Sequence, residues 1–311
     1  MLVARDFLRN GCLRNSSTRN TVLLRHITTT PLPRVSVNND VEDQGTVAHL
    51  LRPFHEQQTP VILQDYAKSW PALKQWQDWD YLLARIGEEW HCDVEMGAYN
   101  NSQEGRLSIP FGAYLDYLRL YQEQQQTMTS DSDESAPPML YLAQNDLPHG
   151  LYSDIVLPPF WQSNNSPLQT TTTTTTTPPT ILGQGKLYQC MFWMGPPGAE
   201  SPLHFDPLDN LLCQVVGTKH VVLLDRHAAS HDVLQAGAAY GQQENTSALP
   251  MQSLLLSQST TASSSSASLD DLDFMTGSLQ PGDALYIPSK WWHYVSSTST
   301  DFTISVNVWW R

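Results

Sequence analysis

Short apolar runs separated by turn residues make up the C-terminal half of the chain. Glycine, proline, aspartate and serine lie between these runs, as at Gly195–Gly198 and Pro281–Asp283. Six runs have the length and composition of strands: Leu187–Met194, Leu211–Val216, His220–Leu224, Ala284–Ile287, Trp292–Ser296 and Phe302–Trp310. Strands joined by tight turns, with no helical periodicity between them, predict an antiparallel barrel or jelly roll of the cupin class.

The N-terminal third of the sequence mixes helix and strand signals. Pro60–Leu63 is short and apolar, as expected of a buried strand, and Trp79–Ile86 carries apolar residues on a helical stripe. Pro110 precedes apolar residues at spacings of three and four up to Tyr121, which predicts a helix with proline in its first turn. We therefore predict a mainly β protein of the α+β type, with N-terminal helices packed outside a barrel.

Three low-complexity stretches interrupt the globular pattern. They are rich in Gln, Ser, Thr or Pro and span about 122–138, 164–180 and 253–269, the second with an unbroken threonine run. Such segments cannot bury enough apolar area to offset the entropy lost on ordering, so we expect surface loops. Because strand-like sequence resumes after each, they are predicted to be insertions in one domain spanning 41–311.

Residues 1–34 form a basic segment distinct from the rest of the chain. Six of the 17 basic residues and one of the 31 acidic residues fall here, among serine, threonine and leucine. This composition is typical of a mitochondrial transit peptide, although a basic tail on a cytoplasmic or nuclear protein would look similar.

The remaining chain is strongly acidic, with 11 basic and 30 acidic residues outside the basic segment. Such a balance disfavours nucleic acid and favours basic peptide or protein partners. No stretch approaches the roughly 18 to 20 apolar residues of a membrane span. The four cysteines are scattered, which argues against a disulfide framework or a structural zinc site. Nothing in the pattern indicates the oligomeric state.

His204, Asp206 and His293 are the candidate metal ligands. Two histidines and a carboxylate can bind ferrous iron on one face and leave positions open for other ligands. On a strand, residues i and i+2 point to the same side, so His204 and Asp206 could enter a barrel together. An isolated H-x-D match is weak in a chain with ten histidines, and most lone histidines are core or surface residues.

The sequence around these residues resembles the JmjC-domain, cupin-like hydroxylases, in particular the small JmjC-only branch of the lysine-specific demethylase 8 or arginyl hydroxylase type. The resemblance covers about 41–311. It rests on the following stretches: Ser201–Asn210, Pro281–Pro288, Pro60–Leu63, Trp70–Pro71, Tyr141–Gln144 and Trp309–Trp310.

The resemblance implies a double-stranded β-helix with His204 and Asp206 on its second strand and His293 on its seventh. It also implies Fe(II), 2-oxoglutarate as cosubstrate and O2. Lys219, on the fourth strand, would hold the distal carboxylate of 2-oxoglutarate. Further polar residues at family positions of the cosubstrate pocket are Ser201, Asn210, Tyr141 and Asn307.

Simpler readings exist for several of these positions. Lys219 follows a hairpin turn and could be solvated like most lysines, and Asn210 could cap a turn. Tryptophans such as Trp193 and Trp309 are more often core or rim residues than substrate platforms.

The implied activity is hydroxylation of a protein side chain, arginine or lysine being favoured by the acidic body, with demethylation when the hydroxylated carbon is an N-methyl group. Two alternatives stay open. One is hydroxylation of a modified tRNA base. The other is a non-catalytic cupin that binds a metal or a partner protein.

Overall fold

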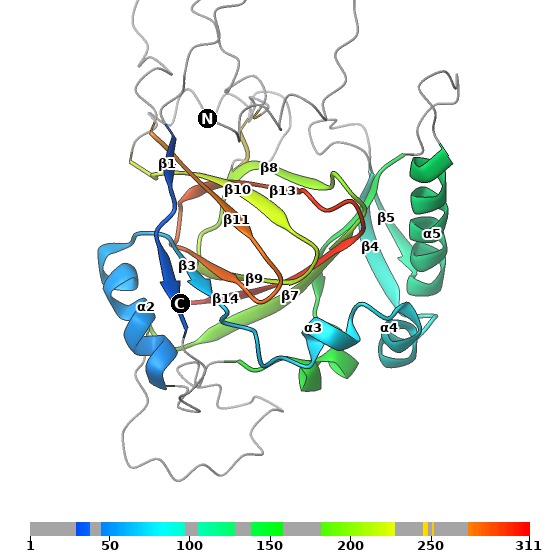
Figure 1. Cartoon of the computed structure of the whole chain (residues 1–311), viewed down its shortest axis with the longest axis horizontal. Helices are drawn as coiled ribbons and strands as arrows, with labels where there is room; N and C mark the ends of the chain where they lie inside the picture. The colour runs from blue at the N-terminus through cyan, green and yellow to red at the C-terminus, as the bar shows by residue number, and fades with distance from the viewer. Residues whose placement is uncertain are drawn as a thin grey trace, which may run out of the picture.

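The computed structural model describes residues 29–37, 45–96, 105–127, 138–157, 182–227, 245–247, 251 and 273–311. Within them, strands β7 to β14 form a barrel of two facing antiparallel sheets (Figure 1). The barrel strands are β7 (Leu187–Gly195), β8 (Glu200–Phe205), β9 (Asp209–Val216), β10 (Lys219–Leu224), β11 (Phe274–Leu279), β12 (Ala284–Ile287), β13 (Trp292–Ser297) and β14 (Thr303–Trp310). The sheet orders β12-β9-β14-β7 and β11-β10-β13-β8 are those of a double-stranded β-helix, so the predicted fold class is confirmed.

Further strands extend both sheets of the barrel. They are β1 (Thr29–Pro31), β2 (Arg34–Ser36), β3 (Val61–Gln64), β4 (His91–Met96), β5 (Arg106–Pro110) and β6 (Leu140–Asp146). β1 pairs with β11, β2 and β3 extend the larger sheet beyond β12, and β6, β4 and β5 extend it beyond β7. The end of the predicted basic tail therefore contributes a strand to each sheet, and ordered structure begins before residue 41. Residues 1–28 lie outside the described part.

Helices lie on the outside of the barrel, as predicted (Figure 1). They are α2 (Gly45–Gln57), α3 (Ala72–Gln75), α4 (Trp79–Ile86), α5 (Phe111–Thr127) and a 3-10 turn η1 (His149–Asp154). The prediction of a helix over Trp79–Ile86 is confirmed, and the Asp78 carboxylate caps its N-terminus by accepting from the backbone N–H groups of Asp80 and Tyr81. None of the described helices has the length and apolar character needed to cross a bilayer.

Of the three predicted low-complexity loops, the structure describes part of the first. Helix α5 continues to Thr127, so the first residues of the predicted 122–138 loop are helical instead. Glutamine has good helix propensity, which lets an established helix extend through this tract. The stretches 164–180 and 253–269 lie outside the described residues.

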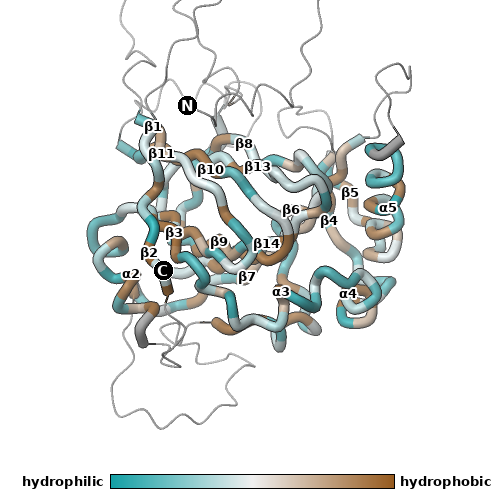
Figure 2. The backbone as a smooth tube through the Cα atoms, in the orientation of Figure 1, coloured by the Kyte–Doolittle hydropathy of each residue, from teal (hydrophilic) through white to brown (hydrophobic). Residues whose placement is uncertain are grey.

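Successive side chains of a strand point to opposite faces of the sheet, so the apolar residues pack in two layers, one between the sheets and one outside them. Strand β10 illustrates this, since Val221 and Leu223 pack between the sheets while Val222 and Leu224 pack on the outer face of the smaller sheet. Figure 2 shows hydrophobic segments along β9 and β14, at the centre of the larger sheet. The outer face of that sheet packs on the helices through large buried side chains such as Trp76 and Tyr114. Fully burying a side chain of this kind stabilises the fold by roughly 1.5–3 kcal/mol.

The space between the sheets is not apolar throughout. Buried polar side chains gather on the inward faces of its strands: Asn210, Lys219, His293, Ser305 and Asn307. Burying polar groups is costly unless they are paired or await a ligand, so this region is the place to look for a functional site.

Candidate metal centre

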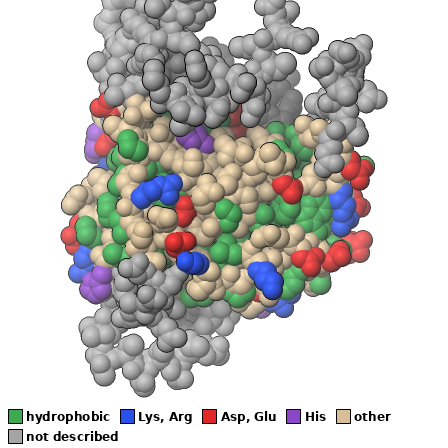
Figure 3. Space-filling model, viewed as in Figure 1, with side chains coloured by type: hydrophobic (Ala, Val, Ile, Leu, Met, Phe, Trp, Pro, Cys, Tyr) green, Lys and Arg blue, Asp and Glu red, His purple; other side chains and the backbone are tan. Residues whose placement is uncertain are grey.

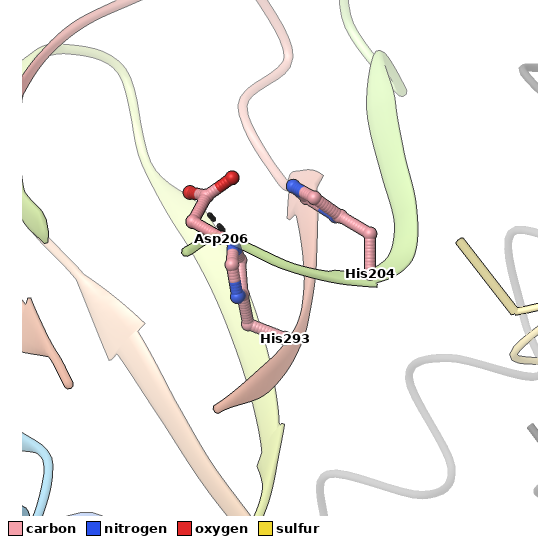
Figure 4. A group of neighbouring side chains, drawn as sticks. All are labelled: His204, Asp206 and His293. Carbon is pink, nitrogen blue, oxygen red and sulfur yellow. Dashed lines mark ion pairs between the residues drawn. The ribbon is translucent and has the colours of Figure 1, made fainter. Parts of the chain in front are cut away.

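Strands β8 and β13 bring the predicted ligands together. They pair antiparallel with His204 opposite His293, and the two imidazole ring centroids are 4.2 Å apart. Asp206 follows directly after the end of β8, and its Oδ2 lies 3.7 Å from Nε2 of His293 (Figure 4). One donor atom from each residue lies within 4.8 Å of the others. The sequence expected Asp206 on the strand, whereas it lies in the loop just beyond it.

Backbone contacts orient both imidazoles. Nδ1 of His204 lies 2.7 Å from the carbonyl oxygen of Pro202, and Nδ1 of His293 lies 3.0 Å from that of Trp291. A carbonyl can only accept, so each Nδ1 carries a proton and Nε2 is the nitrogen of each ring that can bind a metal. Burial, together with the neighbouring His204, lowers the pKa of His293 to about 4. Its imidazole is therefore neutral at neutral pH, as metal binding requires.

This donor set fits a ferrous ion. Two neutral imidazoles and one carboxylate on one side of a site are the ligands of non-haem Fe(II) oxygenases, and they leave coordination positions open. The carboxylate is itself held, because Nδ2 of Asn210 donates to Oδ2 of Asp206 at 3.4 Å. Nδ2 of Asn307 in turn donates to Oδ1 of Asn210 at 3.2 Å. Outer contacts of this kind fix the orientation of a metal-binding carboxylate.

Lys219 lies at the start of β10 and points into the same pocket, not into solvent. Its side chain is 3% exposed, and its Nζ donates to Oγ of Ser305 at 2.7 Å and to the Tyr141 hydroxyl at 3.4 Å. Within the described residues, no carboxylate lies within 4.0 Å of this ammonium group. Burial lowers the pKa of Lys219 to about 7. A buried cation with only neutral partners is suited to bind an anion.

The predicted cosubstrate residues divide into two groups in the structure. Tyr141 and Ser201 share a hydrogen bond beside Lys219, and both line the pocket. Asn307 also lines the pocket, and its buried Oδ1 has no hydrogen-bond partner within the part of the chain that the structure describes. Asn210 donates from its side-chain amide to Asp206, and its role towards the cosubstrate stays a prediction.

Sequence reasoning missed several pocket residues. Ser305 contacts Lys219, and its spacing of two from Asn307 on one strand could have found it. Trp193 and Trp309 line the pocket, and each has a buried indole N–H without a hydrogen-bond partner among the described residues. Gln144 also lines it and has a φ of 54°, beside a register shift between β6 and β7. A bulge of this type redirects a side chain, and the sequence carried no signal for it.

The barrel and its two-histidine, one-carboxylate cluster define a protein of the cupin class. The chain belongs to the cupin-like domain family, whose model matches residues 47–311. The resemblance to JmjC-domain proteins is confirmed by individual relatives. The chain is 31% identical over 294 residues to Jumonji C domain-containing protein 5 of Drosophila melanogaster, covering 90% of this chain and 62% of that protein.

Other relatives carry more specific names. Lysine-specific demethylase JMJ30 of Arabidopsis thaliana is 30% identical over 275 residues, covering 84% of this chain and 52% of that protein. The tRNA wybutosine-synthesizing protein 4 of Neurospora crassa is 24% identical over 291 residues, covering 90% of this chain and 20% of that protein. The chain thus spans less than two thirds of the length of each of the first two relatives. None of these names supports mitochondrial targeting.

Proposed function

We propose that this chain is an Fe(II)- and 2-oxoglutarate-dependent oxygenase that hydroxylates a protein side chain. One observation carries the proposal: a pocket that holds His204, Asp206 and His293 also holds Lys219, a buried cation without a carboxylate partner among the described residues. A metal site alone would fit many cupins. The added cation supplies the binding partner that a dicarboxylate cosubstrate needs.

The chain's own residues have distinct tasks in this proposal. Bound Fe(II) would supply O2 activation coupled to decarboxylation of 2-oxoglutarate. Lys219, with Tyr141 and Ser305, holds the distal carboxylate and so sets the angle at which the cosubstrate approaches the metal. Asn210 keeps Asp206 turned towards the two imidazoles. The indoles of Trp193, which is buried, and Trp309, which is half-buried, limit the access of water to the pocket and present N–H donors to a substrate.

A cationic side chain is the favoured substrate group. Glu95 on β4 lies opposite Tyr141 in the pairing with β6. Burial raises the pKa of the Tyr141 phenol, and the charge of Glu95 adds to this effect. Burial raises the pKa of Glu95 to about 7, against the opposing effect of Arg106. A half-buried carboxylate beside the pocket would gain from a neighbouring arginine or lysine. Demethylation would follow when the hydroxylated carbon is an N-methyl group, a reaction that the names of several relatives suggest.

Hydroxylation of a tRNA base is the second candidate, favoured by the relative named tRNA wybutosine-synthesizing protein 4. The negative net charge of the chain argues against a tRNA substrate. On the face in Figure 3, Lys and Arg side chains of the described residues are scattered among Asp and Glu and form no basic cluster there. A phosphate backbone needs such a cluster.

The test is an anaerobic titration of the full chain with Fe(II) and then 2-oxoglutarate, followed by succinate release in air. We expect 2-oxoglutarate to bind only after Fe(II), and basic peptides to raise succinate release. His204→Ala is the matched control and should abolish both. Failure of the Fe(II)-loaded protein to bind 2-oxoglutarate would reject the proposal, and stimulation by tRNA but not by peptides would favour the second candidate.

A further inference from the structure

Strand β8 carries the first metal ligand but lies at the edge of its sheet. In the smaller sheet the order is β1-β11-β10-β13-β8, so among the described strands β8 pairs only with β13. An edge strand presents a row of backbone N–H and C=O groups that another segment can pair with. Because Asp206 follows β8 directly, displacement of this edge would move two of the three ligands.

A distant segment of the chain, Asn245–Ser247, covers this edge at His204. Thr246 forms an antiparallel bridge with His204, and the backbone N–H of Ser247 donates to the carbonyl oxygen of Leu203 at 2.8 Å. Thr246 and Ser247 are 3% and 1% exposed. Both residues are therefore as deeply buried as residues within a strand of the sheet. The segments on either side, 228–244 and 248–250, lie outside the described residues.

Asn245 binds both backbone groups of the residue between the two ligands. Its carbonyl oxygen accepts from the N–H of Phe205 at 3.0 Å, and its side-chain Nδ2 donates to the carbonyl oxygen of Phe205 at 2.8 Å. The Phe205 ring packs edge-to-face on Trp292, the neighbour of His293, at 5.0 Å between centroids. Phe205 is thus held by its backbone and its side chain.

We propose that Asn245 is a positioning residue for the metal centre. The relative orientation of His204 and Asp206 depends on the backbone of the single residue between them, and Asn245 fixes that backbone from outside the sheet. The inference rests on the proposed function, since it assumes that the triad binds Fe(II). Loss of an outer contact that orients metal ligands typically lowers metal affinity by about 10–100-fold.

The variant Asn245→Ala removes the side-chain donor, and Asn245→Asp keeps the size of the side chain but replaces the donor with an acceptor. Asn145→Ala is a matched control, because Asn145 Nδ2 makes comparable bonds to the carbonyl oxygens of Asp93 and Ala143 on β4 and β6. All proteins are titrated anaerobically with Fe(II) alone, and their melting temperatures are measured without metal. We expect both Asn245 variants to bind Fe(II) about 10–100-fold more weakly than wild type. Asn145→Ala should lose thermal stability but keep its Fe(II) affinity.

A second measurement needs no variant. Because binding effects are reciprocal, Fe(II) should slow amide hydrogen exchange at Phe205 and Ser247 in the wild-type chain. Unchanged Fe(II) affinity in a folded Asn245 variant, or unchanged exchange at these amides, would overturn the positioning role alone. If wild type has no Fe(II) site that His204→Ala removes, both the proposed function and this inference fail.

Discussion

Replacing Lys219 by methionine should weaken cosubstrate binding and stabilise the cosubstrate-free protein. Methionine keeps the length and apolar stem of lysine but removes the charge. In the structure the ammonium group is buried against Ser305 and Tyr141, with no carboxylate within 4.0 Å among the described residues. The charge is therefore costly until an anion arrives.

The expected changes in affinity and stability follow from the lowered pKa of Lys219 and from the loss of its hydrogen bond to 2-oxoglutarate. A hydrogen bond to a charged group contributes about 1.5–3 kcal/mol, so Lys219→Met should bind 2-oxoglutarate roughly 10- to 150-fold more weakly. Lowering the pKa of Lys219 from 10.5 to about 7 corresponds to at most about 5 kcal/mol of instability in the protein without cosubstrate. Between pH 7 and 10.5 the unfolded chain binds more protons than the folded one, so wild-type stability rises with pH in this range. The stabilising effect of methionine should be largest at or below pH 7 and fade towards pH 10.

Two assays distinguish an anion-binding role of Lys219 from a role in packing alone. Anaerobic calorimetry at several pH values should show wild-type affinity for 2-oxoglutarate falling up to about tenfold per pH unit above 7, as the unliganded lysine loses its proton. Lys219→Met should show no such dependence, and the exposed Lys186→Met is the control. Equal 2-oxoglutarate affinity in wild type and Lys219→Met, or a less stable variant at pH 7, would refute the reasoning.

Three further predictions concern the metal, the substrate and the fold. His204→Ala should remove the rise in melting temperature that Fe(II) gives to the wild type, as followed by calorimetry, and a retained rise would place the metal elsewhere. Glu95→Gln should raise KM for a basic peptide about tenfold with little change in kcat. In wild type the affinity for that peptide should increase through pH 7 as Glu95 ionises; a flat wild-type profile would contradict the role of Glu95. Asp154→Ala should destabilise the fold by about 2–4 kcal/mol in urea, because it leaves the Trp76 indole and the Tyr81 hydroxyl without their acceptor. Fe(II) affinity should not change in that variant.

The sequence alone determined the local elements and the kinds of chemistry present. The runs at Ala284–Ile287 and Trp79–Ile86 formed the predicted strand and helix because hydrophobic periodicity and capping are local properties. Strands β1 and β11 were missed. β1 lies in a segment with the composition of a tail and is a strand only because it pairs with β11. Its conformation is set by tertiary pairing, which local propensity does not contain.

For the candidate site, too, the sequence indicated one part and the tertiary structure decided the other. Residue types and spacing singled out His204, Asp206 and His293 as candidates, and the resemblance to JmjC-domain hydroxylases added Lys219. Only the tertiary structure decided what faces them. It turned Asn210 towards Asp206, put Ser305 against Lys219, and brought Asn245 from a distant segment onto the backbone of Phe205. Such contacts depend on strand register and loop closure over many residues, and no periodicity in the chain encodes them.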